Sequence, residues 1–284
     1  MVTKTLLQTY LGCDPGKRVH QGMIAKGQGV SARSVIWFSD VRGFTKRSDK
    51  CGRIIALDVV NTVFGLTEKA MTKHGGEMLK FMGDGCMAIF PEESSVEDDA
   101  ALPELGEAQR DGSVRKGTAM FDFTDSEKLQ GLAEEKDQDE EELGSRASCA
   151  LITGDGEDAT KRARLATLEL QQLIRKKSYD RAEKGLPEIG VGVGLHFGTC
   201  SHGNVGGESR LDFTVIRPAV NLASRAESLC GKLDACALAT KTFVKLDEDS
   251  EDGDWTFRGT HEVKGVSQPV DVFQLDVQSE APQQ

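Results

Sequence analysis

The strongest constraint on the fold is that the negative charge of this chain is concentrated in one segment. Between Glu92 and Glu142 there are 18 acidic residues against 5 basic ones, whereas the whole chain of 284 residues has a net charge of −11. The segment has few apolar residues and no clear period, so it cannot bury enough surface to offset its ordering entropy. We therefore expect a long, largely disordered acidic insert at about residues 93–145, which acts as a spacer or as a partner-binding segment.

Outside this segment the sequence is typical of a soluble globular protein. Hydrophobic residues make up 38% of the chain and charged residues 29%, which favours a packed core. The seven cysteines include no C-x-x-C pair, and their odd number indicates free thiols in a reducing compartment. Residues 1–10 lack the apolar region of a signal peptide, and no run approaches the length of a membrane span. We expect a cytoplasmic protein without membrane insertion, and its basic residues are too dispersed for nucleic-acid binding.

The apolar periodicity and the turn residues predict a series of strands and helices. Strands are expected at 35–39 and 210–216, and hairpins at 77–90, around a Gly-Asp-Gly tip, and at 189–206. Helices are expected at about 53–73, at 159–183 and from Pro218 to about Leu229, because proline suits the first helical position. A last strand pair is expected at 255–257 and 270–275. This order, with a mixed sheet, predicts an α+β fold.

Two aspartates are predicted to lie at the ends of neighbouring strands. Asp40 follows the first strand, and Asp84 occupies the tip of the first hairpin. Strands that are adjacent in sequence usually lie together, so both carboxylates can converge at one end of the sheet. Two carboxylates with few other ligands suit Mg²⁺, and a pair of such ions can assist phosphoryl chemistry. Alternatively, Asp40 caps a helix and Asp84 is a turn residue, but the flanking stretches favour the metal interpretation.

A second group of polar residues lies on the helix that is expected after Pro218. Asn221 and Arg225 are four residues apart and therefore share one helical face. An amide and a guanidinium suit a nucleotide, because the amide can hold the ribose and the arginine can neutralise phosphate charge in the transition state. Taken alone, the pair is better explained as part of an exposed polar helix face.

In combination, these stretches resemble the catalytic domain of class III nucleotidyl cyclases. The matching segments are "FSDVRGFT", "GGEMLKFMGDGCMAIFP", "GVGLHFGTCSHGNVG", "LDFTVIRPAVNLASR" and "VKGVSQPVDVFQL", in that order. The resemblance implies an α+β fold with a ferredoxin-like βαββαβ core. It also implies a lead-in segment at residues 1–30 and a catalytic domain at residues 31–278, interrupted by the acidic insert.

The resemblance assigns metal and phosphate contacts to individual residues. Asp40, Asp84 and the Val41 carbonyl match the ligands of two Mg²⁺ or Mn²⁺ ions in each active site. Phosphate contacts are implied for the backbone of a short loop and for one lysine: Gly43, Phe44, Thr45 and Lys264.

Four further residues match positions that contact the nucleoside. Asn221 and Arg225 match the catalytic pair that orients the ribose and stabilises the transition state, and Lys80 and Thr214 match the pair that reads the purine. A lysine can donate to a ring acceptor but cannot accept from guanine's amine, whereas a threonine hydroxyl can accept from adenine's amino group. Guanylyl cyclases of the family generally carry Glu where Lys80 stands. The pair therefore favours adenine, and Thr214 resembles the threonine-containing, bacterial-type subgroup of adenylyl cyclases.

The implied activity is that of an adenylyl cyclase with ATP as its substrate. In this family the ribose 3′-oxygen attacks the α-phosphate, which gives 3′,5′-cyclic AMP and pyrophosphate. Each active site takes its metal ligands from one domain and its Asn/Arg/Lys set from another, so a chain that carries both sets implies a homodimer. The alternatives are a guanylyl cyclase and a non-catalytic homologue that binds a nucleotide or a partner cyclase.

One position departs from the family's pattern. Arg217, in "TVIRPAVN", stands where family members usually have glycine. If that glycine uses a positive φ, arginine strains the turn that positions both Thr214 and the Asn221–Arg225 pair. We expect this strain to lower turnover without abolishing it. The alternatives are a turn that has shifted to a conformation arginine tolerates, a contact of Arg217 with the nucleotide or the partner chain, and a tolerated surface substitution.

Overall fold

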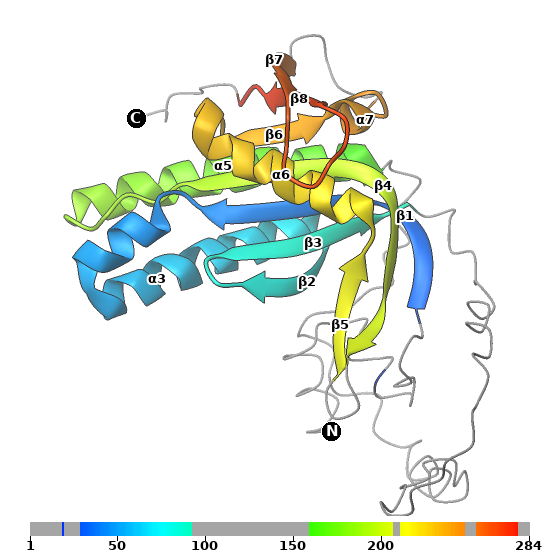
Figure 1. The fold of residues 1–284 in the computed structure, drawn as a ribbon. Helices are drawn as coiled ribbons and strands as arrows, with labels where there is room; N and C mark the ends of the chain where they lie inside the picture. The colour runs from blue at the N-terminus through cyan, green and yellow to red at the C-terminus, as the bar shows by residue number, and fades with distance from the viewer. Residues whose placement is uncertain (1–18, 20–28, 93–158, 207–210, 248–253, 278–284) are drawn as a thin grey trace, which may run out of the picture. The chain divides into compact units, whose positions relative to one another are not determined.

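Strand β1 (Gly29–Val41) lies inside the sheet and has a hydrogen-bonded neighbour on each side (Figure 1). The computed structural model describes residue 19 and residues 29–92, 159–206, 211–247 and 254–277. The expected lead-in at 1–30 and the acidic insert at about 93–145 lie almost wholly outside these ranges. Their boundaries therefore stay predictions.

The described residues form eight strands and four helices, and all of these elements belong to one compact unit. In chain order after β1 they are α3 (Phe44–Lys73), β2 (Glu77–Met82), β3 (Gly85–Pro91), α5 (Ala159–Glu183), β4 (Val191–Gly206), β5 (Leu211–Ile216), α6 (Pro218–Leu233), β6 (Ala237–Thr240), α7 (Lys241–Val244), β7 (Trp255–His261) and β8 (Val270–Leu275).

The strand order confirms the predicted α+β fold and its ferredoxin-like core. The sheet runs β2-β3-β1-β4-β6-β8-β7, and β5 pairs with β4 off this path. The first four strands in this order pair antiparallel and are connected as β1-α3-β2-β3-α5-β4, which is the βαββαβ arrangement. The β4–β6 pair is parallel, so the sheet is mixed.

Both faces of β1 are covered in its middle, which explains why Val35–Phe38 is an unbroken apolar run. Val35 and Trp37 pack with the buried residues of α3 and α5, whereas Ile36 packs with Ala219 and Ala223 of α6. Figure 1 shows the same layers, with α6 in front of the sheet and α3 and α5 behind it.

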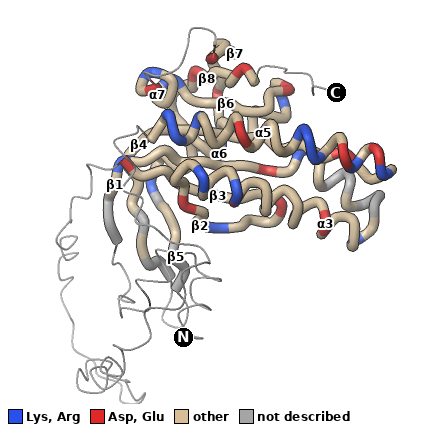
Figure 2. Tube along the Cα trace, turned by 180° about the vertical axis from the view of Figure 1, so that it is seen from behind, with Lys and Arg blue, Asp and Glu red and all other residues tan. Residues whose placement is uncertain are grey.

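Along α5, basic and acidic residues are interspersed (Figure 2).

Several features differ from the prediction, and neither β6 nor α7 was expected. The predicted hairpin over residues 189–206 is wrong, because β4 is a single strand that pairs with β1 along residues 191–203 and with β5 along 201–206. Gly198 in its middle does not adopt the positive φ of a tight turn. The helix expected at 53–73 begins earlier, at Phe44, and is interrupted at Gly52 (φ 75°, ψ 158°). None of the helices in the described ranges combines the length and apolarity that crossing a membrane requires.

Candidate active site

The structure brings Asp40 and Asp84 together at one end of the sheet. Asp40 is the register partner of Gly85, the first residue of β3, and the Val41 backbone N–H donates to the Asp84 carbonyl oxygen at 3.2 Å. The hairpin turns through Gly83, whose φ is 69°. The pKa of Asp40 is raised to about 6, first by burial of its carboxyl and then by the neighbouring charge of Asp84.

The chemistry of this end of the sheet fits a hard divalent cation. Asp40 Oδ1 is buried and accepts no hydrogen bond from the described residues, so an electron-rich oxygen lacks a positive partner. A Cβ at Gly85 would lie 3.3 Å from this oxygen and 2.7 Å from the Ser39 carbonyl oxygen, so glycine keeps the space open. Within the described ranges, no group of three or more His, Cys, Asp or Glu side chains could hold a metal ion. Two carboxylates with remaining positions left to water or phosphate suit Mg²⁺ better than zinc.

The predicted phosphate loop connects β1 to α3. Gly43 is the N-cap residue of α3 and is left-handed, with φ 64° and ψ 23°. The Arg42 backbone N–H donates to the Gly190 carbonyl oxygen at 2.9 Å, which anchors the loop to the start of β4. The helix then begins at Phe44, and Thr45 lies in its first turn. N–H groups at a helix start have no intrahelical acceptor, so this loop can bind an anion.

Arg225 of α6 and Lys264 come together through a hydrogen bond. Arg225 Nε donates to the Lys264 carbonyl oxygen at 2.9 Å, which joins α6 to the turn between β7 and β8. The side chains of Asn221 and Lys264 are exposed. Among the described residues, no hydrogen bond or ion pair links this group to Asp40 or Asp84. We call the aspartate pair the metal half-site and Arg225 with Lys264 the Arg225 half-site.

The two residues expected to read the purine lie on different strands. Lys80 is on β2, opposite Met87 of β3, and Thr214 is on β5, opposite Gly203 of β4. Both side chains are half-buried. Thr214 comes four residues before Pro218, where α6 begins, so the same turn positions it relative to Asn221.

Sequence reasoning missed Glu227, an acid of α6 whose carboxyl lies near the aspartates. Its pKa is raised to about 7, first by burial and then by the charge of Asp40, while Arg42 acts in the opposite direction. The sequence spacing could have indicated this position. Glu227 is four residues after buried Ala223 and therefore lies on the helix face that packs against the sheet.

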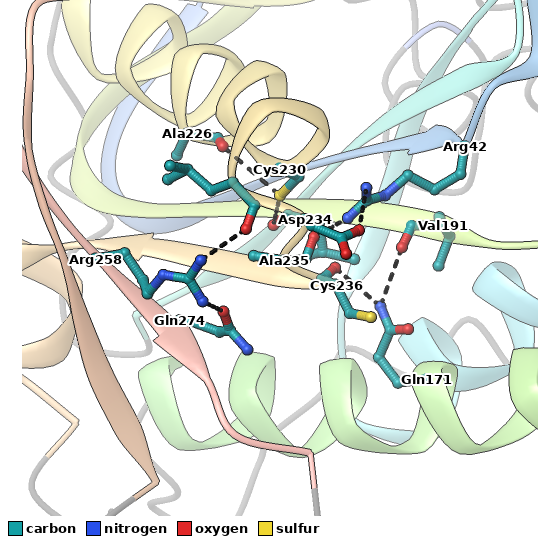
Figure 3. Close-up of polar contacts among 12 residues, drawn as sticks. Arg42, Gln171, Val191, Ala226, Cys230, Asp234, Ala235, Cys236, Arg258 and Gln274 are labelled. Carbon is teal, nitrogen blue, oxygen red and sulfur yellow. Dashed lines mark hydrogen bonds and ion pairs between the residues drawn. The ribbon is translucent and has the colours of Figure 1, made fainter.

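Arg42 ties the metal end of β1 to the end of α6. Its guanidinium donates to the Ala235 carbonyl oxygen and lies 4.0 Å from the Asp234 carboxylate (Figure 3). In the same region, the Cys230 thiol donates to the Val193 carbonyl oxygen at 3.3 Å. These contacts hold the end of α6 against β4, beside the segment that carries Asp40.

Comparison with known proteins identifies the family but does not decide between an adenine and a guanine nucleotide as the substrate. Residues 141–276 match the family described as "Adenylate and Guanylate cyclase catalytic domain". An adenylate cyclase of Anabaena cylindrica is 28% identical over 226 residues, covering 78% of this chain and 32% of that protein. The adenylyl cyclase CyaB from P. aeruginosa is 22% identical with a TM-score of 0.59, covering 88% of this chain and 96% of that one. The guanylyl cyclase Cya2 is also 22% identical, with a TM-score of 0.56, covering 87% and 93%.

The similarity extends over most of this chain but over only part of its curated relatives. The chain spans about a third of the length, or less, of the first curated relatives that it matches. Solved adenylyl and guanylyl cyclases resemble it about equally, so the fold alone does not choose between ATP and GTP. The family match, the ferredoxin-like core and the matching motifs agree: the chain carries an adenylate and guanylate cyclase catalytic domain and belongs to the class III nucleotidyl cyclases.

Proposed function

We propose that this protein is an adenylyl cyclase that converts ATP to 3′,5′-cyclic AMP and pyrophosphate. The observation that carries the proposal is the convergence of Asp40 and Asp84 around a buried carboxylate oxygen that lacks a hydrogen-bond partner among the described residues. This arrangement is costly without a cation, because burial and mutual repulsion both disfavour the ionised carboxylates.

In the proposed reaction, each residue acts on a defined part of the nucleotide. Asp40, Asp84 and the Val41 carbonyl would hold two Mg²⁺ or Mn²⁺ ions, which would supply electrostatic stabilisation of the reacting phosphate. The N–H groups around Gly43 and Phe44 bind phosphate oxygens. Together with them, further residues act on the triphosphate and the ribose: Thr45, Lys264, Asn221 and Arg225. Arg225 neutralises charge that develops on the phosphate, and Asn221 orients the ribose so that its 3′-oxygen faces the α-phosphate.

The active site is completed by a second copy of the chain. The metal half-site lies at the end of β1, and the Arg225 half-site lies where α6 meets the turn between β7 and β8, without a direct polar link between them in the described part of the chain. Two copies related by a two-fold axis would present the metal half-site of each to the Arg225 half-site of the other. We infer two equivalent sites per homodimer.

The choice of adenine rests on Lys80 and Thr214. A lysine donates to an acceptor on the purine ring, and the threonine hydroxyl can accept from the amino group of adenine. Guanine offers an amine to the position of Lys80, and lysine has no lone pair to receive it. Both side chains are half-buried, so an unpaired polar group there would lower the affinity for the wrong purine.

The test is a direct assay of the purified chain with ATP or GTP, in Mg²⁺ or Mn²⁺, with the cyclic product identified by mass spectrometry. We expect cyclic AMP from ATP at a rate far above the formation of cyclic GMP from GTP. The Asp40→Asn variant serves as the inactive control. Similar rates with both nucleotides would overturn the purine assignment, and no product from either would identify a non-catalytic homologue.

A further inference from the structure

Glu227 faces the metal half-site although it lies on the helix that carries Arg225. Gly192 of β4 is the register partner of Asp40, and a Cβ at Gly192 would lie 3.2 Å from Glu227 Oε1 and 3.4 Å from Arg42 Nε. Side chains of register partners lie on the same face of a sheet. The carboxylate of Glu227 and the guanidinium of Arg42 are therefore on the same face of the sheet as the Asp40 side chain.

Glycines at two positions of β4 allow this approach. At Gly194, a Cβ would lie 2.5 Å from the Ala223 carbonyl oxygen and closer still to the Glu227 backbone nitrogen. The helix backbone thus rests directly on the strand, and the space left at Gly192 holds the Glu227 carboxylate. The close packing of α6 holds this acid near Asp40.

The electrostatics agree with the geometry. The charges of both Asp40 and Asp84 raise the pKa of Glu227, and that of Arg42 lowers it, after the larger effect of burial. Three carboxylates and one guanidinium therefore share one region at the end of β1. An excess of negative charge there is unfavourable in the metal-free protein and favourable once divalent cations are bound.

We propose that Glu227 is a positioning residue of the metal half-site, a third carboxylate that strengthens divalent-cation binding by Asp40 and Asp84 through space. It is not a ligand, because no group of three such side chains in the described ranges has the geometry to hold a metal ion. The proposal rests on the proposed function only in taking Asp40 and Asp84 as the ligands. A structural role, in which Glu227 only supports Arg42 against the Ala235 carbonyl, predicts that loss of the carboxylate lowers stability and leaves divalent-cation affinity unchanged.

The test measures binding of Mn²⁺ alone to the full chain, without nucleotide, from the free-ion signal in electron paramagnetic resonance. Glu227→Gln should weaken binding about 10-fold, the lower end of what loss of an outer-shell partner costs. Glu227→Asp, which keeps the charge, should recover most of the affinity. Glu68→Gln, which removes an exposed acid of α3, is the control for net charge and should bind as the parent does.

Thermal unfolding of the metal-free protein separates this role from a structural one. Glu227→Gln should unfold at a temperature no lower than the parent, because it removes a carboxylate that the two aspartates repel. A lower unfolding temperature together with unchanged Mn²⁺ affinity would overturn the proposal. If Glu227→Gln does not fold, Glu227→Ala decides instead: it should also weaken Mn²⁺ binding about 10-fold, and unchanged binding contradicts the proposal.

Asp40→Asn distinguishes this proposal from the metal assignment itself. This variant should abolish specific Mn²⁺ binding. The binding that remains measures the weak association of Mn²⁺ with acidic residues elsewhere in the chain. If Asp40→Asn removes binding and Glu227→Gln does not weaken it, the role of Glu227 is wrong and the metal half-site stands. If Asp40→Asn binds Mn²⁺ as the parent does, both the metal half-site and the role of Glu227 are wrong.

Discussion

At the scale of single residues, the raised pKa of Asp40 makes the metal-free protein sensitive to pH. The folded protein holds a proton on Asp40 up to about pH 6, whereas the unfolded chain releases it near the ordinary value of 3.8. Between these values the folded state binds more protons, so the free energy of unfolding falls as pH rises. The loss is complete above the raised pKa and is on the order of 1 kcal/mol, because Asp40 is partly exposed and solvent screens its neighbours.

Thermal unfolding in the presence of a chelator checks this expectation. The parent and Asp40→Asn should unfold at similar temperatures at pH 4.5, where Asp40 is protonated. At pH 7.5 the variant should be the more stable of the two, because it lacks the buried charge. A parent that is the more stable protein at pH 7.5 without metal would show that the Asp40 carboxylate is favourably paired there.

Arg217 is a second residue with a measurable consequence. Its φ of 139° and ψ of 165° are strained for a residue with a Cβ, and its Nε donates to Ser201 Oγ at 2.7 Å. The strain costs roughly 1 kcal/mol or more. It falls on the N-cap of α6, four residues before Asn221, and a misplacement of about 1 Å can cost on the order of 10²-fold in rate.

We expect Arg217→Gly to raise kcat with little change in protein yield, as steady-state assays of cyclic AMP formation can measure. Arg217→Ala is the matched control, because it also loses the bond to Ser201 but keeps a Cβ at the strained position. If the glycine variant is equal to or slower than the parent, strain at this turn does not limit turnover.

At the scale of elements, the contact between α6 and β4 determines where the catalytic helix lies. Gly194→Ala would push a methyl group into the backbone of α6 at Ala223 and Glu227. We expect a loss of stability of about 1–3 kcal/mol, the usual cost of overpacking, and a displaced α6. Gly231→Ala on the same helix meets no atom within 4 Å and should be neutral or stabilising by up to about 1 kcal/mol.

Urea unfolding of the two alanine variants compares their free energies of unfolding directly. Loss of activity in Gly194→Ala is expected to accompany the loss of stability, because Asn221 and Arg225 move with the helix. Equal free energies of unfolding for Gly194→Ala and Gly231→Ala would contradict this expectation, because they would mean that β4 shifts at Gly194 without loss of stability.

The elements that the sequence predicts well are those whose signals are local. The bounds of α5 match the predicted helix at 159–183, and the first hairpin turns at the predicted Gly-Asp-Gly tip. Both predictions depend only on residues that are close together in the sequence. The single strand β4 could not be predicted, because its continuity depends on pairing with β1 and β5. The same holds for Glu227, whose position beside Asp40 arises from helix packing across β4. Asp40 and Asp84 were predictable as neighbours, because each ends a recognisable strand.

At the scale of the whole molecule, the acidic segment should be dispensable for folding. The described residues at either side of it are already joined, since Arg162 of α5 donates to the Pro91 carbonyl oxygen at 2.6 Å and to the Gly75 carbonyl oxygen at 3.1 Å. Deleting residues 95–144 shortens a connection between fixed ends, and loop length changes the closure entropy only logarithmically.

We expect the deletion variant to be soluble, with an unfolding temperature and basal cyclase activity close to those of the parent. Gel filtration, thermal unfolding and the cyclic AMP assay check this expectation. Insoluble protein would show that the acidic segment packs on the catalytic core.

The central claim is that two copies of the chain share each active site, and complementation between inactive variants tests it most directly. Asp40→Asn loses a metal ligand, and Arg225→Ala loses phosphate neutralisation, so each variant should be inactive alone. In a mixed dimer, one site would combine the intact metal half-site of the Arg225→Ala chain with the intact Arg225 of the Asp40→Asn chain. Mixing the variants should therefore restore cyclic AMP formation from ATP, up to about half of the parent rate per dimer if the sites are independent. No activity from dimers shown to contain both variants would contradict the account.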